Sequence, residues 1–200
     1  MKKLTLRQRQ GIETKLKITR VATELFKTQG FNNVTVRDIC ESASISVGTF
    51  YHHFVSKDEI VNTAHYQIDM LWEERISSYE SRNTREDILY MFEEAGALLE
   101  ELGWDLAAQN YKQLITAKTK YAIQKDRPIS GQLDRIIRTG MDRDDFLPGT
   151  DPEELTETLL RSSRGVLFDW CLNEGSYNLK EAIRHDLSLI LTNFCRPWMQ

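Results

Sequence analysis

The chain has 200 residues, 40% of them hydrophobic, and a formal net charge of −4. This length suits one or two domains with a sizeable core, and no apolar run approaches the roughly 18 residues of a membrane-spanning helix. The three cysteines, Cys40, Cys171 and Cys195, are too few and too far apart for a disulfide framework or a zinc site. We therefore expect a cytoplasmic protein without a membrane segment, a bound metal or a cofactor.

The charges are unevenly distributed along the chain. Residues 1–60 contain 10 Lys and Arg against 6 Asp and Glu, a net charge of +4, whereas residues 61–200 contain 16 against 24, a net charge of −8. A basic segment ahead of an acidic one is expected when the first part contacts nucleic acid. Without a DNA-binding motif, the same charges would form only a solvated basic tail.

Apolar residues recur at three- and four-residue spacing along nearly the whole chain, which predicts an all-α protein of about nine helices. No run of alternating β-branched residues bounded by turns is present, so no strand is expected. The predicted helices cover approximately residues 10–28, 36–42, 46–53, 56–79, 84–102, 105–124, 130–141, 151–173 and 178–194.

Residues 35–54 predict two short helices joined by a tight turn. Thr35 is a suitable N-cap for the first helix and forms a capping-box-like pair with Asp38, while Ser46 caps the second helix. Only residues 43–45 separate the two helices. Apolar residues hold the pair together and leave small and hydrogen-bonding side chains outward, which suits insertion into a major groove of DNA.

This segment resembles the DNA-binding core of the tetracycline-repressor (TetR) family of bacterial transcription regulators. The resemblance covers roughly residues 10–62 and rests on Ala22–Phe26, Gly30-Phe31, Val34–Ile39, Ser46–Phe54 and Lys57–Ile60. One departure is Ser44, where the family usually has glycine, and we expect Ser44 to adopt a left-handed backbone at a cost of roughly 1 kcal/mol. Another is Cys40, where alanine is common. Beyond residue 62 the resemblance rests on helix order and length.

The resemblance implies a helix-turn-helix DNA-binding domain at residues 1–55 and a ligand-binding and dimerisation domain at residues 56–200. It also implies a set of DNA contacts at helix N-termini, on the recognition helix and at the lysine that follows it. On this chain those positions are Thr35, Arg37, Ser46, Val47, Gly48, Thr49, Tyr51, His52 and Lys57. We expect Tyr51 and Lys57 to bind phosphate, and Thr49 and His52 to reach base edges. The alternative for each residue is a solvated helix face.

Aromatic and apolar residues in the second part of the chain are candidates for a ligand pocket, with Asn110 and Gln113 as polar groups that would orient a ligand. The pocket candidates are Trp72, Phe92, Trp104, Asn110, Tyr111, Leu114 and Phe168. An ordinary helical core would contain the same kinds of residue, and it is the family resemblance that favours a pocket.

The last two predicted helices carry clear apolar stripes, and the first of them has a second apolar face made of Leu160, Leu167 and Cys171. Stripes on two sides predict one face for the protomer core and one for a partner, and in the resembled family this helix pair forms a four-helix dimer interface. The interface candidates are Leu159, Ser162, Val166, Trp170, Leu187 and Leu191. The alternative is that all of them pack inside one chain.

Together these features predict a homodimeric DNA-binding transcriptional regulator, a repressor that an unknown small-molecule effector releases from a palindromic double-stranded DNA operator. The competing prediction is a constitutive or protein-regulated DNA-binding protein that needs no small ligand. An enzyme is not expected, because the sequence has neither a glycine-rich phosphate loop nor a G-x-S-x-G motif. A metal at His52 and His53 is not expected, because neighbouring side chains on a helix point about 100° apart.

Overall fold

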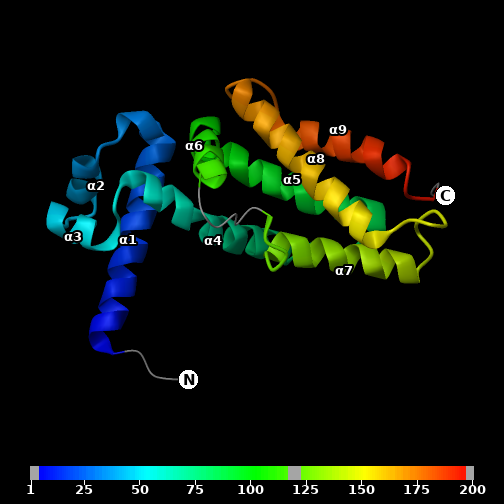
Figure 1. Ribbon diagram of the computed structural model, residues 1–200, viewed down its shortest axis with the longest axis horizontal. Coiled ribbons are helices and arrows are strands. Elements are labelled where there is room, and N and C mark those ends of the chain that lie inside the picture. Colours follow the sequence, from blue (N-terminus) through cyan, green and yellow to red (C-terminus); the bar gives the residue numbers. More distant parts are fainter. Residues whose placement is uncertain (1–4, 117–122, 197–200) are drawn as a thin grey trace.

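The computed structural model of the protein describes residues 5–116 and 123–196, and it is built from helices (Figure 1). No strand occurs within these two ranges, so the all-α prediction is confirmed. The helical segments are α1 (Leu6–Gln29), η1 (Phe31–Asn33), α2 (Val36–Ser42), α3 (Val47–His53), α4 (Lys57–Ile76), α5 (Thr84–Leu102), α6 (Trp104–Thr116), α7 (Pro128–Asp142), α8 (Pro152–Leu172) and α9 (Leu179–Thr192).

Side-chain caps fix several helix starts where the sequence predicts them. Thr35 and Asp38 form the full capping box of α2. At the start of α8, the Asp151 carboxylate accepts hydrogen bonds from two backbone amides, and Pro152 occupies the first helical position. Asn178 caps α9 through its side-chain oxygen, which accepts a hydrogen bond from the amide of Glu181. These short-range interactions satisfy amides that have no partner inside the helix, which is why the predicted starts are accurate.

Other helix boundaries differ from the prediction. Asn83, not Thr84, caps α5 with its side-chain oxygen. Ser56 makes no side-chain cap bond at the start of α4; instead the Glu59 carboxylate accepts a hydrogen bond from the Val55 amide at 2.6 Å. α4 ends at residue 76 instead of about residue 79. Residues 117–122 of the predicted sixth helix lie outside the described residues.

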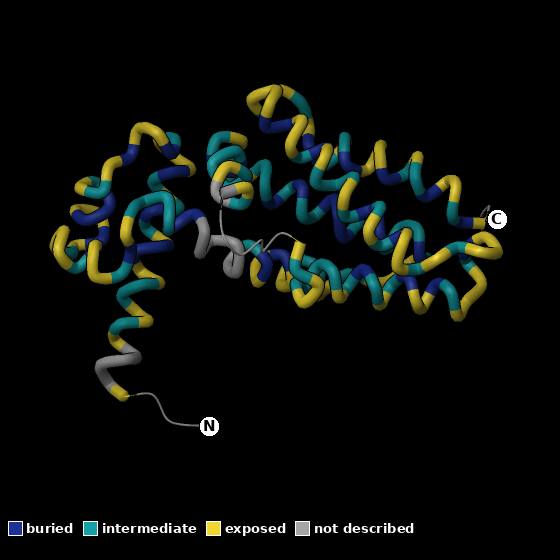
Figure 2. Tube along the Cα trace, in the orientation of Figure 1, coloured by how far each residue is buried: buried dark blue, intermediate teal, exposed yellow. Residues whose placement is uncertain are grey.

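The buried apolar side chains form two clusters. The smaller cluster holds α1, η1, α2, α3 and the first turn of α4 together. The larger cluster contains residues from every helix from α4 through α9. Figure 2 shows one group of buried residues among α1, α2 and α3 and the other among the remaining helices. Leu106, in the first turn of α6, belongs to the smaller cluster. The two parts of the molecule therefore meet at the start of α4, at the start of α6 and at Leu102, the last residue of α5.

α7 lies so close to α5 that one position on it has no room for a side chain. A Cβ atom at Gly140 would be 2.5 Å from Thr84 Cγ2 and 2.6 Å from Phe146 Cε2. Gly131 lies on the same helix, and a Cβ atom there would meet nothing within 4 Å. The two glycines lie on the same helix but differ in packing, so substitutions at Gly131 serve as a control for substitutions at Gly140.

We predict that Gly140→Ala lowers the free energy of unfolding by about 1–3 kcal/mol, because the added methyl group overpacks the contact between α7 and α5. Gly131→Ala should instead raise it by up to about 1 kcal/mol, through helix propensity alone. Urea denaturation followed by tryptophan fluorescence at a fixed protein concentration measures both values. Equal stabilities of the two variants would contradict the described packing.

Candidate nucleic-acid interface and internal cavity

α2, the turn after it and α3 form a compact unit with a buried inner face. Ile39, Cys40, Phe50 and Phe54 are buried on this face. The turn is tight because Ser44 adopts a left-handed backbone with φ of 51°, as the sequence predicts. That conformation lets the amide of Ile45 donate to the carbonyl of Cys40 at 3.0 Å.

The outer face of α3 is open. Val47, Gly48, Tyr51 and His52 are exposed, and Thr49 is half-buried. Residues four apart on a helix lie on the same side, so Val47 and Tyr51 form one row and Gly48 and His52 form the next. A Cβ atom at Gly48 would come no closer than 3.7 Å to any neighbouring atom, so another chain can approach the backbone there.

Two of the predicted DNA contacts already have partners within the protein. The Ser46 hydroxyl accepts from the Thr49 amide at 3.0 Å and lies 2.9 Å from the Thr49 hydroxyl. The Thr35 hydroxyl donates to the Asp38 carboxylate at 2.7 Å, and the Thr35 amide donates to the same oxygen. These hydrogen bonds from Thr35 lower the pKa of Asp38, so a carboxylate occupies the start of α2. Arg37, next to it, is exposed.

Lys57 has a role that the sequence prediction missed. Its ammonium group donates to the carbonyl of Phe31 at 2.7 Å and to the carbonyl of Val34 at 2.8 Å. It also lies 4.3 Å from the centre of the Phe31 ring, and burial lowers the pKa of this lysine. Two of its three N–H donors therefore tie the start of α4 to η1, and one is left for a phosphate.

The same peptide segment is held from the other side by α6. The Asp105 carboxylate accepts from the amide of Phe31 at 2.9 Å. Gly30 precedes this contact with φ of 82°, and a Cβ atom on it would lie 3.3 Å from the Asp105 carboxylate. Phe31 and Asp105 are 74 residues apart in the sequence, so no local pattern reveals the contact. We refer to Lys57, Phe31 and Asp105 as the Phe31 junction.

The second part of the molecule contains a partly open cavity of about 130 Å³ between α4, α5, α6 and α8. Five of the predicted pocket residues line it: Trp72, Phe92, Asn110, Tyr111 and Leu114. The side chain of Gln113 lies outside the described residues. The other lining side chains are mainly aliphatic, so most of the wall is apolar, as is usual for small-molecule sites.

Three charged residues in the cavity wall were not predicted. Arg127 binds the buried Asp69 carboxylate through two nitrogens, at 2.7 Å and 3.2 Å. Arg164 also lines the cavity, and burial lowers its pKa. The Tyr111 hydroxyl donates to the carbonyl of Arg164 at 2.7 Å, and burial raises the pKa of this tyrosine. Arg127 lies outside the predicted helices and pairs with α4, so sequence periodicity gave no signal for it.

The other two predicted pocket residues do not line this cavity. Trp104 is 37% exposed and packs over Gly175, where a Cβ atom would be 3.0 Å from the tryptophan. Phe168 is 46% exposed, and its ring meets the Tyr111 ring edge-on at a centroid distance of 5.9 Å. Aromatic character alone therefore did not identify the residues that line this cavity.

The predicted dimer interface needs a similar correction. Five of its six residues are buried within one chain, namely Leu159, Val166, Trp170, Leu187 and Leu191. Of the six, only Ser162 is half-buried. The apolar stripes therefore form the protomer core, because α9 packs against both α5 and α8. The apolar side chains left exposed on α8 and α9 are Phe168, Leu172 and Leu189.

In the parts of the chain described above, no helix is long and apolar enough to cross a membrane.

The fold and the α2–turn–α3 unit define a helical protein with a helix-turn-helix. Residues 18–64 match the family described as "Bacterial regulatory proteins, tetR family". The HTH-type transcriptional regulator UidR of Escherichia coli is 39% identical over 54 residues, which cover 27% of this chain and 28% of UidR. This alignment thus spans less than a third of UidR.

Two further comparisons cover more of the chain. The HTH-type transcriptional regulator TcmR of Streptomyces glaucescens is 31% identical over 155 residues, which cover 70% of this chain and 66% of TcmR. A putative transcriptional regulator of Saccharomonospora viridis, solved in complex with choline, has the same fold, with a TM-score of 0.69 and 20% identity over 93% of this chain and all of that one. The chain belongs to the TetR family.

The positive φ of Ser44 should lower the free energy of unfolding, because a non-glycine residue adopts this conformation at a cost. Ser44→Gly should raise the free energy of unfolding of the α1–α3 unit by about 0.5–1 kcal/mol, because glycine adopts this conformation without a steric penalty. Ser42→Gly, in the last turn of α2, should lower it by about 0.5 kcal/mol. Far-ultraviolet circular dichroism during denaturation measures the change. If both variants lose stability, the turn does not have the described conformation.

Proposed function

We propose that the protein is a transcriptional regulator that binds operator DNA as a homodimer and is released from it by a small molecule. The observation that carries this proposal is that the outer face of α3 is exposed while its inner face is buried in the smaller apolar cluster. A short helix that exposes small and hydrogen-bonding side chains in this way fits the major groove of DNA. Family membership and the names of the related regulators support the same function.

The geometry suggests a role for each residue on or near the outer face of the α2–α3 unit. Thr49 and His52 approach base edges, and Gly48 allows close approach of the backbone. Arg37 and Tyr51 contact phosphates, with the remaining N–H of Lys57 as an additional donor. Because phosphate contacts give affinity and base contacts give specificity, these two groups of residues have separable effects.

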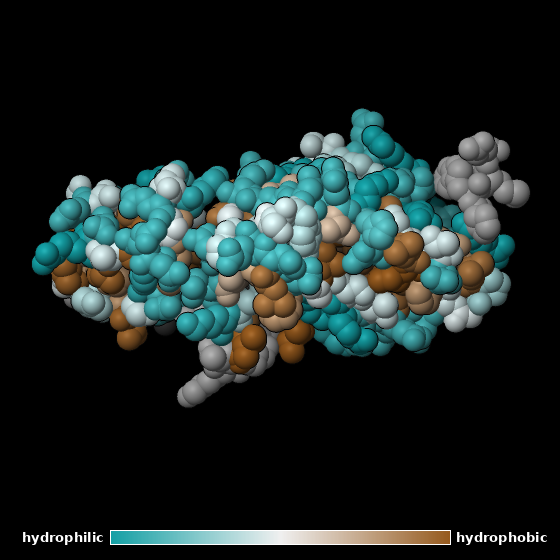
Figure 3. All heavy atoms as spheres, turned by 90° about the horizontal axis from the view of Figure 1, so that it is seen from above, coloured by the Kyte–Doolittle hydropathy of each residue, from teal (hydrophilic) through white to brown (hydrophobic). Residues whose placement is uncertain are grey.

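A homodimer is supported by the exposed side chains on α8 and α9. Phe168, Leu172 and Leu189 are large, apolar and exposed. Gly165 precedes Phe168 by three residues on α8, and a Cβ atom there would meet nothing within 4 Å, which leaves room for a second helix. Figure 3 looks at the molecule from the side on which α8 and α9 lie in Figure 1, and it shows separate apolar patches among hydrophilic side chains. Pairing of two copies there would align two α3 helices with a palindromic operator.

The cavity supports a small-molecule effector. Its volume of about 130 Å³ is comparable to that of an engineered apolar cavity of about 150 Å³ that holds benzene. A drug-sized ligand needs about 300 Å³ or more, so such a ligand has to displace the walls, including Trp72 on α4 and Leu114 on α6. Both helices begin at the Phe31 junction. A ligand that favours the displaced arrangement by about 5.5 kcal/mol would shift a 99:1 population of bound and released forms to 1:99.

The small volume also supports the second candidate function, a DNA-binding protein that needs no small ligand. A thermal-shift screen with a broad panel of metabolites separates the two. Under the effector proposal, at least one compound raises the melting temperature and weakens DNA binding. If no compound does either, the constitutive alternative is favoured.

DNA binding is tested with duplexes selected by the protein from a randomised pool. The selected sites should be palindromes with half-sites about 34–36 Å apart. Arg37→Ala should weaken binding to all selected sequences and reduce the salt slope by about 1. Arg82→Ala removes the same charge from an exposed position between α4 and α5 and should leave the slope unchanged. His52→Ala should relax the base preference, at a cost of about 1–3 kcal/mol.

Two results would contradict this proposal. One is a monomer in sedimentation at micromolar concentration, which would exclude the dimer. The other is an equal loss of salt dependence in Arg37→Ala and Arg82→Ala, which would mean that the basic face of the α2–α3 unit does not contact DNA.

A further inference from the structure

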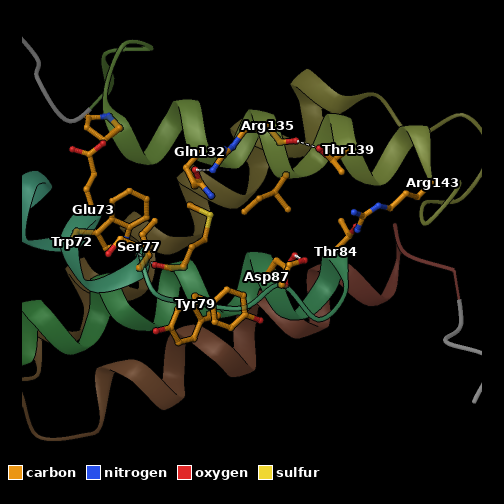
Figure 4. A pocket seen from close by; sticks show the side chains of 16 residues that line it. Trp72, Glu73, Ser77, Tyr79, Thr84, Asp87, Gln132, Arg135, Thr139 and Arg143 are labelled. Atoms are coloured by element: carbon orange, nitrogen blue, oxygen red, sulfur yellow. Dashed lines mark hydrogen bonds between the residues drawn. The ribbon is translucent and has the colours of Figure 1, made fainter.

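A second and larger hollow lies outside the cavity, between α7, the end of α4 and the start of α5 (Figure 4). Its volume is about 480 Å³, which is within the range of small-molecule sites. It follows α7 from Pro128 to Arg143, about 22 Å at 1.5 Å per residue. We call it the α7 groove. Its length suits an elongated ligand.

A fixed wall separates the α7 groove from the cavity. Trp72 is the one described residue that lines both. Its indole N–H donates to the backbone carbonyl of Met91 at 2.9 Å, and the side chain is only 2% exposed. Met91 faces the groove, whereas the next residue, Phe92, faces the cavity. The groove is therefore a separate site and not the mouth of the cavity.

The floor of the α7 groove is apolar and partly aromatic. Ile76, Met91 and Ile136 line it together with Trp72. Tyr79 and Tyr90 also line it, and their rings stack at a centroid distance of 3.9 Å and an angle of 12°. Flat aromatic surfaces and branched aliphatic side chains favour an apolar ligand with rings or an extended chain.

The charged groups of the groove are separated along its length. Arg143 is at one end, where its side chain extends toward Thr84, and Glu73 is at the other end (Figure 4). Arg143 and Arg135, which lies between them, form no ion pair with a carboxylate in residues 5–116 and 123–196.

Two carboxylates near this end already accept hydrogen bonds, and of the two only Asp87 lines the groove. Asp87 accepts from the Ser81 hydroxyl at 2.6 Å and from the Arg82 amide at 3.0 Å. Asp145 accepts from the Thr84 hydroxyl at 2.5 Å. The hydrogen-bonding capacity that remains at this end is therefore the planar donor set of a guanidinium group, which matches a carboxylate.

We propose that the α7 groove is a second ligand site, which binds an elongated amphiphilic carboxylate. The apolar body of the ligand lies on Trp72, Ile76 and Ile136, and its carboxylate is bound by Arg143, with Arg135 adding positive charge. Glu73 repels the carboxylate from the opposite end and so fixes the orientation of the ligand. Binding to the groove does not depend on the proposed DNA-binding function. Because Trp72 is on α4, occupancy should also alter DNA affinity, and only this consequence rests on that function.

The test uses 1-pyrenebutyrate as the fluorescent probe and the full chain without DNA. We expect saturable binding, weakened about tenfold or more by Arg143→Gln, because a charge-assisted hydrogen bond is lost. Arg138→Gln is the matched control. It removes the same charge from α7, five residues before Arg143, but Arg138 pairs with Asp134 and does not line the groove. The affinity of this variant for the probe should therefore remain within about twofold of the parent. The neutral analogue 1-pyrenebutanol should bind about tenfold more weakly than the acid.

Two filled variants locate the probe. Thr139→Trp fills the α7 groove from an exposed position and should abolish binding, whereas Leu114→Trp fills the cavity and should leave binding intact. The proposal is overturned if the probe shows no saturable binding, if the alcohol binds as tightly as the acid, or if Arg138→Gln weakens binding as much as Arg143→Gln. Loss of binding in Leu114→Trp but not in Thr139→Trp would place the probe in the cavity and also overturn it. None of these outcomes depends on whether the protein binds DNA.

Discussion

The arrangement of the two parts of this protein depends on one peptide segment, at Phe31. Its amide donates to the Asp105 carboxylate of α6, and its carbonyl accepts from the Lys57 ammonium of α4. Each bond involves a charged group in a half-buried site, where such bonds contribute about 1.5–3 kcal/mol before solvent screening reduces them. Because the amide and the carbonyl of Phe31 are each bonded to a different helix, a shift of either helix relative to η1 would strain or break one of these bonds.

This double attachment gives the cavity a mechanical connection to α3. Trp72 on α4 and Leu114 on α6 both line the cavity, and the two helices that carry them begin at the Phe31 junction. A displacement of either helix therefore changes the position of η1, which is followed directly by α2 and α3. Gly30 allows this contact to form, since its positive φ and the nearby Asp105 carboxylate leave little room for a side chain at this position. We infer that α4 and α6 together transmit a change at the cavity to α2 and α3.

The sequence predicted those features that depend on neighbours within about four residues. The capping box of Thr35, the left-handed backbone of Ser44 and the cap at Asp151 are interactions of this kind. The outward face of α3 also followed, because helical spacing separates Phe50 and Phe54 from Tyr51 and His52. Helix existence was predictable for the same reason, while boundaries such as the end of α4 were not.

Features that depend on contacts between distant segments were missed. An apolar stripe shows that a residue is buried, but it does not show against what, so Leu159 and Leu187 were assigned to a partner when they pack inside one chain. Trp104 and Phe168 are aromatic, yet both are more than a third exposed and neither lines the cavity. The Asp69–Arg127 pair and the Phe31 junction join residues 58 and 74 positions apart, and a single sequence contains no sign of such pairings.

We infer that α6 communicates with the α1–α3 unit through Asp105 and Phe31. A double-mutant cycle on operator affinity tests it, with Leu114→Trp as the perturbation of the cavity and Asp105→Ala as the break in the connection. We predict that Leu114→Trp weakens DNA binding in the parent protein and has much less effect in the Asp105→Ala background, with a coupling energy of about 1–3 kcal/mol. Additive effects, with a coupling energy below about 0.5 kcal/mol, would contradict the account.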